Sequence, residues 1–101
     1  MNIVLGSRGR LGSAIAASLP VNQTITPPRS TYSEWWRDGA DDDVTRYLEN
    51  LIVCESTVFV AAGLINPISP YDEHYRVKYL LPRNVIKGAT KLGCKVVTFG
   101  T

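Results

Sequence analysis

Three glycines, Gly6, Gly9 and Gly12, stand three residues apart directly after the apolar residues 3–5. A glycine turn between a strand and a helix lets backbone N–H groups approach a pyrophosphate, and the positive end of the helix favours the bound anion. The spacing G-x-x-G-x-x-G differs from the standard G-x-G-x-x-G, so a tight glycine turn without a ligand is the alternative. We predict a dinucleotide-binding turn that comprises Gly6, Ser7, Arg8, Gly9, Arg10, Leu11 and Gly12.

A second group of residues bears on which dinucleotide would bind. Chains that bind NAD usually carry Asp or Glu about 20 residues after the first glycine, where the acid bonds the ribose 2′-hydroxyl. Here residues 26–30 read Thr-Pro-Pro-Arg-Ser, and the first acid of the chain is Glu34. The guanidinium of Arg29 can pair with a 2′-phosphate instead, and Arg8 can reach the same phosphate. We therefore favour NADP over NAD, with a solvated loop arginine at position 29 as the alternative.

Small residues form a third candidate group. Ala61, Ala62 and Gly63 end an apolar run, at the carboxyl edge where open α/β sheets bind ligands. Small side chains there let the backbone approach the adenine ribose and the nicotinamide riboside. A plain strand-to-loop turn is the alternative interpretation.

A parallel sheet must bring these three groups together, and the apolar pattern predicts one. Residues 2–5, 23–26, 57–61 and 95–99 are predicted to form strands, and the apolar run at 57–61 is unbroken, as in strands buried on both faces. Strands that alternate with helices imply crossover connections. We expect one α/β domain over residues 1–101: a Rossmann-like parallel sheet of about five strands, with helices on both faces and incomplete at its C-terminus.

Helix signals lie between the expected strands. Residues 11–19 carry an apolar residue every fourth position and end at Pro20, and residues 44–52 form an apolar stripe that the acidic residues 41–43 would cap. A longer helix is predicted over residues 69–92, begun by Ser69 and Pro70 and stopped by Gly93. Pro82 lies inside it and leaves the carbonyl of residue 78 without a helical partner. Residues 29–43 show no clear period.

Composition excludes several classes of function. The net charge of +2 is too small to indicate a nucleic acid or an anionic membrane as partner, and no apolar run approaches the roughly 18 residues of a membrane span. A single histidine and the lack of a C-x-x-C motif argue against a metal site. Cys54 and Cys94 are predicted to be reduced thiols, and the N-terminus lacks the features of a signal peptide, so we expect a cytoplasmic protein.

Several segments resemble, in order and spacing, the extended short-chain dehydrogenase/reductases, the NAD(P)-dependent epimerase/dehydratase family. Residues 6–15 look like the cofactor turn of GDP-fucose synthases. Residues 75–84 are similar to a long helix of dTDP-4-dehydrorhamnose reductases, with Pro82 and Asn84 in place but Lys78 where those enzymes usually have asparagine. Residues 97–101 resemble the strand that delivers the active-site Ser/Thr of the family, which implies that Thr101 is catalytic.

The resemblance implies an oxidoreductase or epimerase that acts on a nucleotide-linked sugar. The Tyr-x-x-x-Lys pair of this family is absent, since no tyrosine in the sequence is followed four residues later by lysine. We therefore expect the NAD(P)-binding part of such an enzyme, an N-terminal fragment that is inactive as the isolated chain. The alternatives are a stand-alone dinucleotide-binding module, or a half-domain completed by self-association or by a partner chain.

Overall fold

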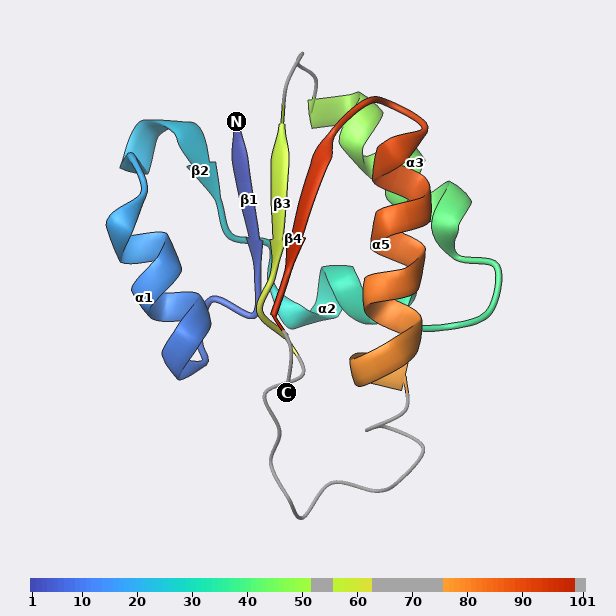
Figure 1. Ribbon diagram of the computed structural model, residues 1–101, viewed down its shortest axis with the longest axis horizontal. Helices are drawn as coiled ribbons and strands as arrows, with labels where there is room; N and C mark the ends of the chain where they lie inside the picture. The colour runs from blue at the N-terminus through green and yellow to red at the C-terminus, as the bar shows by residue number, and fades with distance from the viewer. Residues whose placement is uncertain (52–55, 63–75, 100–101) are drawn as a thin grey trace.

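The computed structural model describes residues 1–51, 56–62 and 76–99. Its centre is a parallel sheet of four strands: β1 (Asn2–Leu5), β2 (Thr24–Ile25), β3 (Thr57–Val60) and β4 (Lys95–Thr98). They stand in the order β2-β1-β3-β4, so β1 pairs with both β2 and β3 (Figure 1). The expected α/β class and parallel sheet are confirmed, with four strands in the described part of the chain where about five were expected.

Helices cover both faces of this sheet. Helix α1 (Arg10–Ser18) lies on one side, while α3 (Asp41–Leu51) and α5 (Leu81–Thr90) pack together on the other (Figure 1). Pro20 follows directly after the cap of α1, and Gly93 adopts a φ of +74° just past α5, as the stop signals predict. No helix in the described ranges has the length and apolar character needed to cross a membrane.

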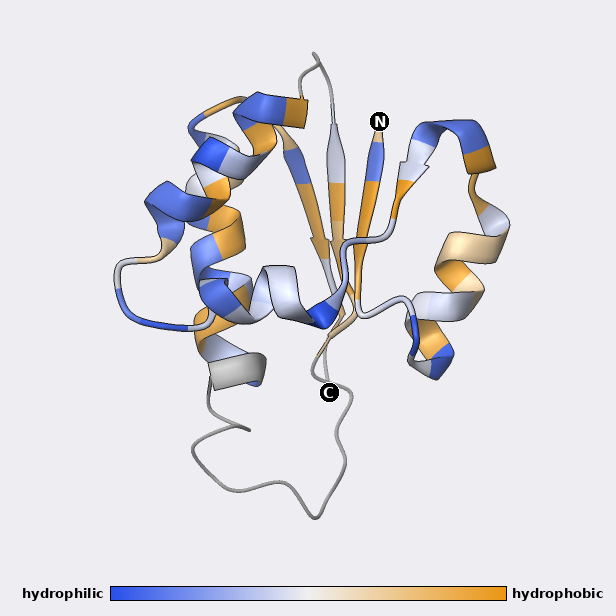
Figure 2. Cartoon of the chain, turned by 180° about the vertical axis from the view of Figure 1, so that it is seen from behind, coloured by the Kyte–Doolittle hydropathy of each residue, from blue (hydrophilic) through white to orange (hydrophobic). Residues whose placement is uncertain are grey.

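The hydrophobic core lies between the sheet and the pair α3 and α5. In Figure 2, the strands and the parts of these helices nearest the sheet carry much of the orange that marks hydrophobic residues. The expectation that β3 is buried on both faces is wrong, because Val58 and Val60 are buried whereas Thr57 and Phe59 are half-buried. Among the described elements, α1 packs mainly against β1. The core residues are Ile3, Leu5, Tyr32, Trp35, Val44, Leu48, Val58, Val60, Leu81, Val85 and Ala89.

Residues 21–43 contain short elements that the sequence pattern did not reveal. A 3₁₀ turn, η1 (Val21–Gln23), precedes β2, and after β2 come α2 (Arg29–Tyr32) and a second 3₁₀ turn, η2 (Ser33–Trp35). The acidic residues occupy the first turn of α3, as predicted. Two of them also make ion pairs with the end of α5, since Lys91 Nζ lies 2.8 Å from Asp41 and 2.9 Å from Asp42.

The described part of the helix predicted over residues 69–92 is π-helical before Leu81 and α-helical from Leu81 onward. A π-helical turn, η3 (Arg76–Leu80), comes first, and α5 then begins at Leu81 with Pro82 in its first turn. Proline is tolerated there because the first N–H groups of a helix have no acceptor within it. The predicted start at Ser69 and Pro70 lies outside the described residues.

Candidate functional site: a cavity at the carboxyl edge of the sheet

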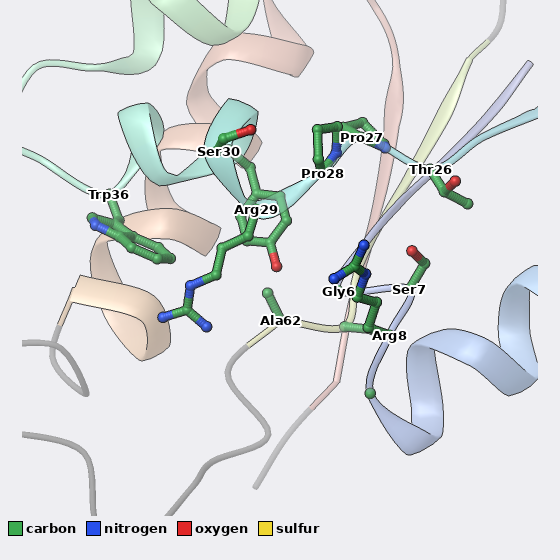
Figure 3. A pocket seen from close by; sticks show the side chains of 13 residues that line it. Gly6, Ser7, Arg8, Thr26, Pro27, Pro28, Arg29, Ser30, Trp36 and Ala62 are labelled. Carbon is green, nitrogen blue, oxygen red and sulfur yellow. The ribbon is translucent and has the colours of Figure 1, made fainter.

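The strand order reverses between β1 and β3, because the chain continues from β1 outward to β2 and from β3 outward to β4. Open α/β sheets bind ligands outside the carboxyl ends of the strands at such a switch point. A cavity of about 610 Å³ lies there, within the range of cofactor sites (Figure 3). This switch-point cavity is lined by Gly6, Ser7, Arg8, Gly9, Thr26, Pro27, Pro28, Arg29, Ser30, Tyr32, Trp36, Ala61 and Ala62.

Gly6 makes the turn that leaves β1. Its φ of +87° is a conformation that favours glycine, and a Cβ at this position would lie 2.6 Å from the backbone nitrogen of Ala62. The first glycine therefore performs two tasks, since it turns the chain and also lets the β1 and β3 ends approach each other beside the cavity.

Gly12 lies in the first turn of α1, outside the cavity lining. A Cβ there would stand 1.8 Å from the carbonyl oxygen of Gly6, so only glycine allows the helix to sit this close to the turn. Close packing against the turn is the structural task of the last glycine in the standard dinucleotide fingerprint as well.

Gly9 has a different environment. It caps α1, donates its N–H to the Gly6 carbonyl over 3.1 Å, and is exposed, so that an added Cβ would meet only that carbonyl, at 3.5 Å. No side chain caps α1 and no acid occupies its first turn. The first N–H groups of a helix lack intrahelical acceptors, so the open space beside Gly9 faces donors and a positive dipole end that suit a pyrophosphate.

Two arginines give the switch-point cavity its charge. Arg8 comes from the glycine turn and Arg29 from the start of α2, and no carboxylate is among the described residues that line the cavity. The Arg29 guanidinium carbon lies 5.0 Å from the ring centroid of Trp36, a cation–π contact that Figure 3 shows at one side of the cavity. A cavity of this composition suits an anionic ligand.

Two aromatic residues of the cavity were missed by the sequence analysis. Tyr32 is 7% exposed and meets Trp36 edge-to-face, with ring centroids 6.1 Å apart. Burial raises the pKa of Tyr32 above its usual 10.0, while the positive charges of Arg29 and Arg8 act in the opposite direction. One signal was available, because Tyr32 follows Arg29 by three residues and would share its face in any helix.

The segment that carries these aromatics is fastened to α5 by a buried amide. Asn84 Nδ2 donates to the carbonyls of Trp35 and Arg37, each over 2.7 Å, so both neighbours of Trp36 are held. Asn84 is 4% exposed. Its two hydrogen bonds fix the backbone that presents Trp36 to the cavity.

The predicted site residues fall into three groups. Gly6, Ser7, Arg8, Gly9, Arg29, Ala61 and Ala62 line the switch-point cavity. Arg10, Leu11 and Gly12 form the first turn of α1 without lining it, and Lys78 lies in the π-helical turn, also outside the lining. Gly63 and Thr101 lie outside the described residues.

Metal binding finds no support among the residues that the structure describes, which contain no group of three His, Cys, Asp or Glu side chains placed to hold an ion. Cys94 is a free, half-buried thiol, and Cys54 lies outside the described ranges. The arginine, hydroxyl and backbone N–H groups that line the switch-point cavity can recognise an anion.

Comparison with known proteins adds no assignment: no family model, no curated protein and no solved structure matches this chain. The functional argument therefore depends on the fold and on the switch-point cavity.

Proposed function

We propose that this chain binds a dinucleotide in the switch-point cavity and prefers NADP to NAD. One observation carries the proposal: a glycine turn and two arginines line one cavity at the strand-order switch, and none of the described residues in its wall is a carboxylate. The turn would hold the pyrophosphate through backbone N–H groups, and the arginines would hold the 2′-phosphate.

The preference for NADP follows from charge. The 2′-phosphate carries close to two negative charges at neutral pH, and a carboxylate at the end of β2 would repel it. The residues that follow β2 along the cavity are Thr26, Pro27, Pro28, Arg29 and Ser30. A guanidinium offers paired donors to phosphate oxygens, whereas it has no comparable partner in the 2′-hydroxyl of NAD.

The wider activity rests on the family resemblance. We infer the cofactor-binding part of a cytoplasmic oxidoreductase or epimerase of nucleotide-linked sugars, in which the bound cofactor supplies hydride transfer and this chain binds and orients it. The absence of a Tyr-x-x-x-Lys pair from the sequence favours binding without turnover by this chain alone. It also favours completion of the active site by a partner chain that carries such a pair over a self-sufficient enzyme.

Calorimetric titration with NADPH and NADH tests the proposal. We expect tighter binding of NADPH. Arg29→Ala should weaken NADPH binding by about 10- to 100-fold, the value of a charge-assisted hydrogen bond, and change NADH binding by less than about twofold. Arg46→Ala removes an exposed arginine of α3 that does not line the cavity, and it should change neither affinity.

Two results would contradict the proposal. Tighter binding of NADH than of NADPH rejects the NADP preference. A folded chain, verified by circular dichroism, that binds neither dinucleotide rejects the cofactor role altogether.

A further inference from the structure

Tyr32 is the one phenol in the wall of the switch-point cavity, as far as the structure describes the chain. We propose that its hydroxyl is a third ligand of the 2′-phosphate, beside Arg29 and Arg8, and thereby a determinant of specificity for 2′-phosphorylated adenosine. This inference rests on the proposed function and deepens it.

The position of Tyr32 in α2 supports the inference. Arg29 opens this short helix and Tyr32 ends it, one turn later, and both residues line the cavity. The backbone N–H of Ser33 donates to the Arg29 carbonyl and closes the turn. Arg29 and Tyr32 therefore lie on the same face of one helical turn, at i and i+3, and can reach the same ligand.

The ring of Tyr32 is fixed by packing. Only 7% of the residue is exposed, and the ring belongs to the hydrophobic core while its residue borders the cavity. Trp36 contacts both partners, edge-to-face with Tyr32 and below the Arg29 guanidinium. Asn84 holds the backbone on both sides of Trp36, so the arrangement is in place before any ligand arrives.

The charges of both arginines act on the Tyr32 hydroxyl. The positive charges of Arg29 and Arg8 each lower the pKa of Tyr32, against the larger rise that burial causes. The phenol therefore stays protonated at neutral pH and can donate its O–H. A phosphate monoester presents three acceptor oxygens, enough for two guanidinium groups and one hydroxyl.

Tyr32→Phe isolates this role, because it removes the oxygen and keeps the ring that the core requires. Tyr47→Phe is the matched control, because burial also raises the pKa of Tyr47 and its ring meets Trp35 at 5.0 Å, yet Tyr47 does not line the cavity. The probes are adenosine 2′,5′-bisphosphate, ADP, NADPH and NADH, titrated into the full chain by calorimetry.

We expect Tyr32→Phe to weaken binding of adenosine 2′,5′-bisphosphate and NADPH by about 10- to 100-fold, the value of one hydrogen bond to a charged acceptor, and to leave the affinities for ADP and NADH within about twofold. Tyr47→Phe should leave all four affinities within about twofold.

Other outcomes separate this inference from the proposed function. NADPH binding that Tyr32→Phe leaves unchanged overturns the inference alone, and so does equal weakening of all four probes, which marks a purely structural role. If the unmodified chain binds the bisphosphate more tightly than ADP but binds neither dinucleotide, the phosphate subsite stands and the dinucleotide function fails. If it binds none of the four, both proposals fall.

Discussion

At the scale of single residues, two glycines of one motif have opposite surroundings. A Cβ at position 12 would collide with the Gly6 carbonyl, whereas a Cβ at position 9 would only make an ordinary van der Waals contact with that carbonyl, at 3.5 Å. The first environment concerns folding, and the second leaves room for a ligand. Substitution of Gly12 is therefore expected to lower stability, whereas substitution of Gly9 is expected to impair ligand binding.

Gly12→Ala should lower the free energy of unfolding by about 1 to 3 kcal/mol or more, because α1 must move away from the turn. Gly9→Ala should change stability by less than about 1 kcal/mol, since only a helix cap is altered, but its methyl group would occupy the space proposed for the pyrophosphate and abolish measurable NADPH binding. Urea denaturation and calorimetry measure the two effects. A Gly9→Ala variant that binds NADPH normally would refute the placement of the pyrophosphate.

Residue types predicted part of this site and missed another part. The glycine turn and both arginines were identifiable because each needs a specific backbone conformation or charge. The aromatic pair Tyr32 and Trp36 was not, because the segment after β2 folds into single turns too short to show a hydrophobic period. The contact between Gly6 and Ala62 joins distant parts of the sequence and needed the fold.

At the scale of elements, Asn84 connects α5 to the segment behind the cavity. Asn84→Ala would leave the carbonyls of Trp35 and Arg37 without their donor, and we expect a loss of about 2 to 3 kcal/mol in the free energy of unfolding. NADPH affinity should fall as well, because Trp36 loses its support. Asn50→Ala, at an exposed position of α3, controls for helix propensity and should cost nothing. Equal stability of the two variants in urea would contradict the buried role.

A second connection between elements depends on pH. Hydrogen bonds from Lys91 lower the pKa of Asp41 below its usual 3.8, and those same bonds to Asp41 and Asp42 raise the pKa of Lys91 to about 12. The Asp41 contribution is therefore complete above its unfolded pKa and is lost as the pH falls through the lowered folded value. The Lys91 contribution is complete below 10.5 and is lost as the pH rises through about 12.

Lys91→Gln should accordingly destabilise the protein by a constant amount between about pH 5 and pH 10, and the difference from the unmodified chain should shrink in acid once Asp41 is protonated. Urea denaturation across this range gives the comparison. Lys95→Gln, which removes an exposed charge from β4, should show no such profile. A Lys91→Gln penalty that persists undiminished at pH 2 would argue against the ion pair as its cause.

At the scale of the whole molecule, the alternation of apolar runs was sufficient to predict a parallel α/β sheet with helices on both faces. Local sequence did not show that Phe59 would be half-buried, on a strand whose neighbours Val58 and Val60 are buried. Nor did it predict the π-helical turn before Pro82, because that turn depends on where the next helix must pack. Periodicity reports which side of an element is apolar, and the arrangement of the other elements decides how well that side is covered.

The central place of β1 has a consequence for how the protein folds. Asn2 pairs with Thr24 on one side and with Thr57 on the other, so neither neighbour is joined to β1 by a hairpin. Pairing of this kind requires large loops to close first, which slows folding and leaves Ile3, Val4 and Leu5 exposed to aggregation until β3 arrives. A ligand bound across the Gly6 turn and Ala62 would join the ends of β1 and β3, and thereby slow the separation of these two strands during unfolding.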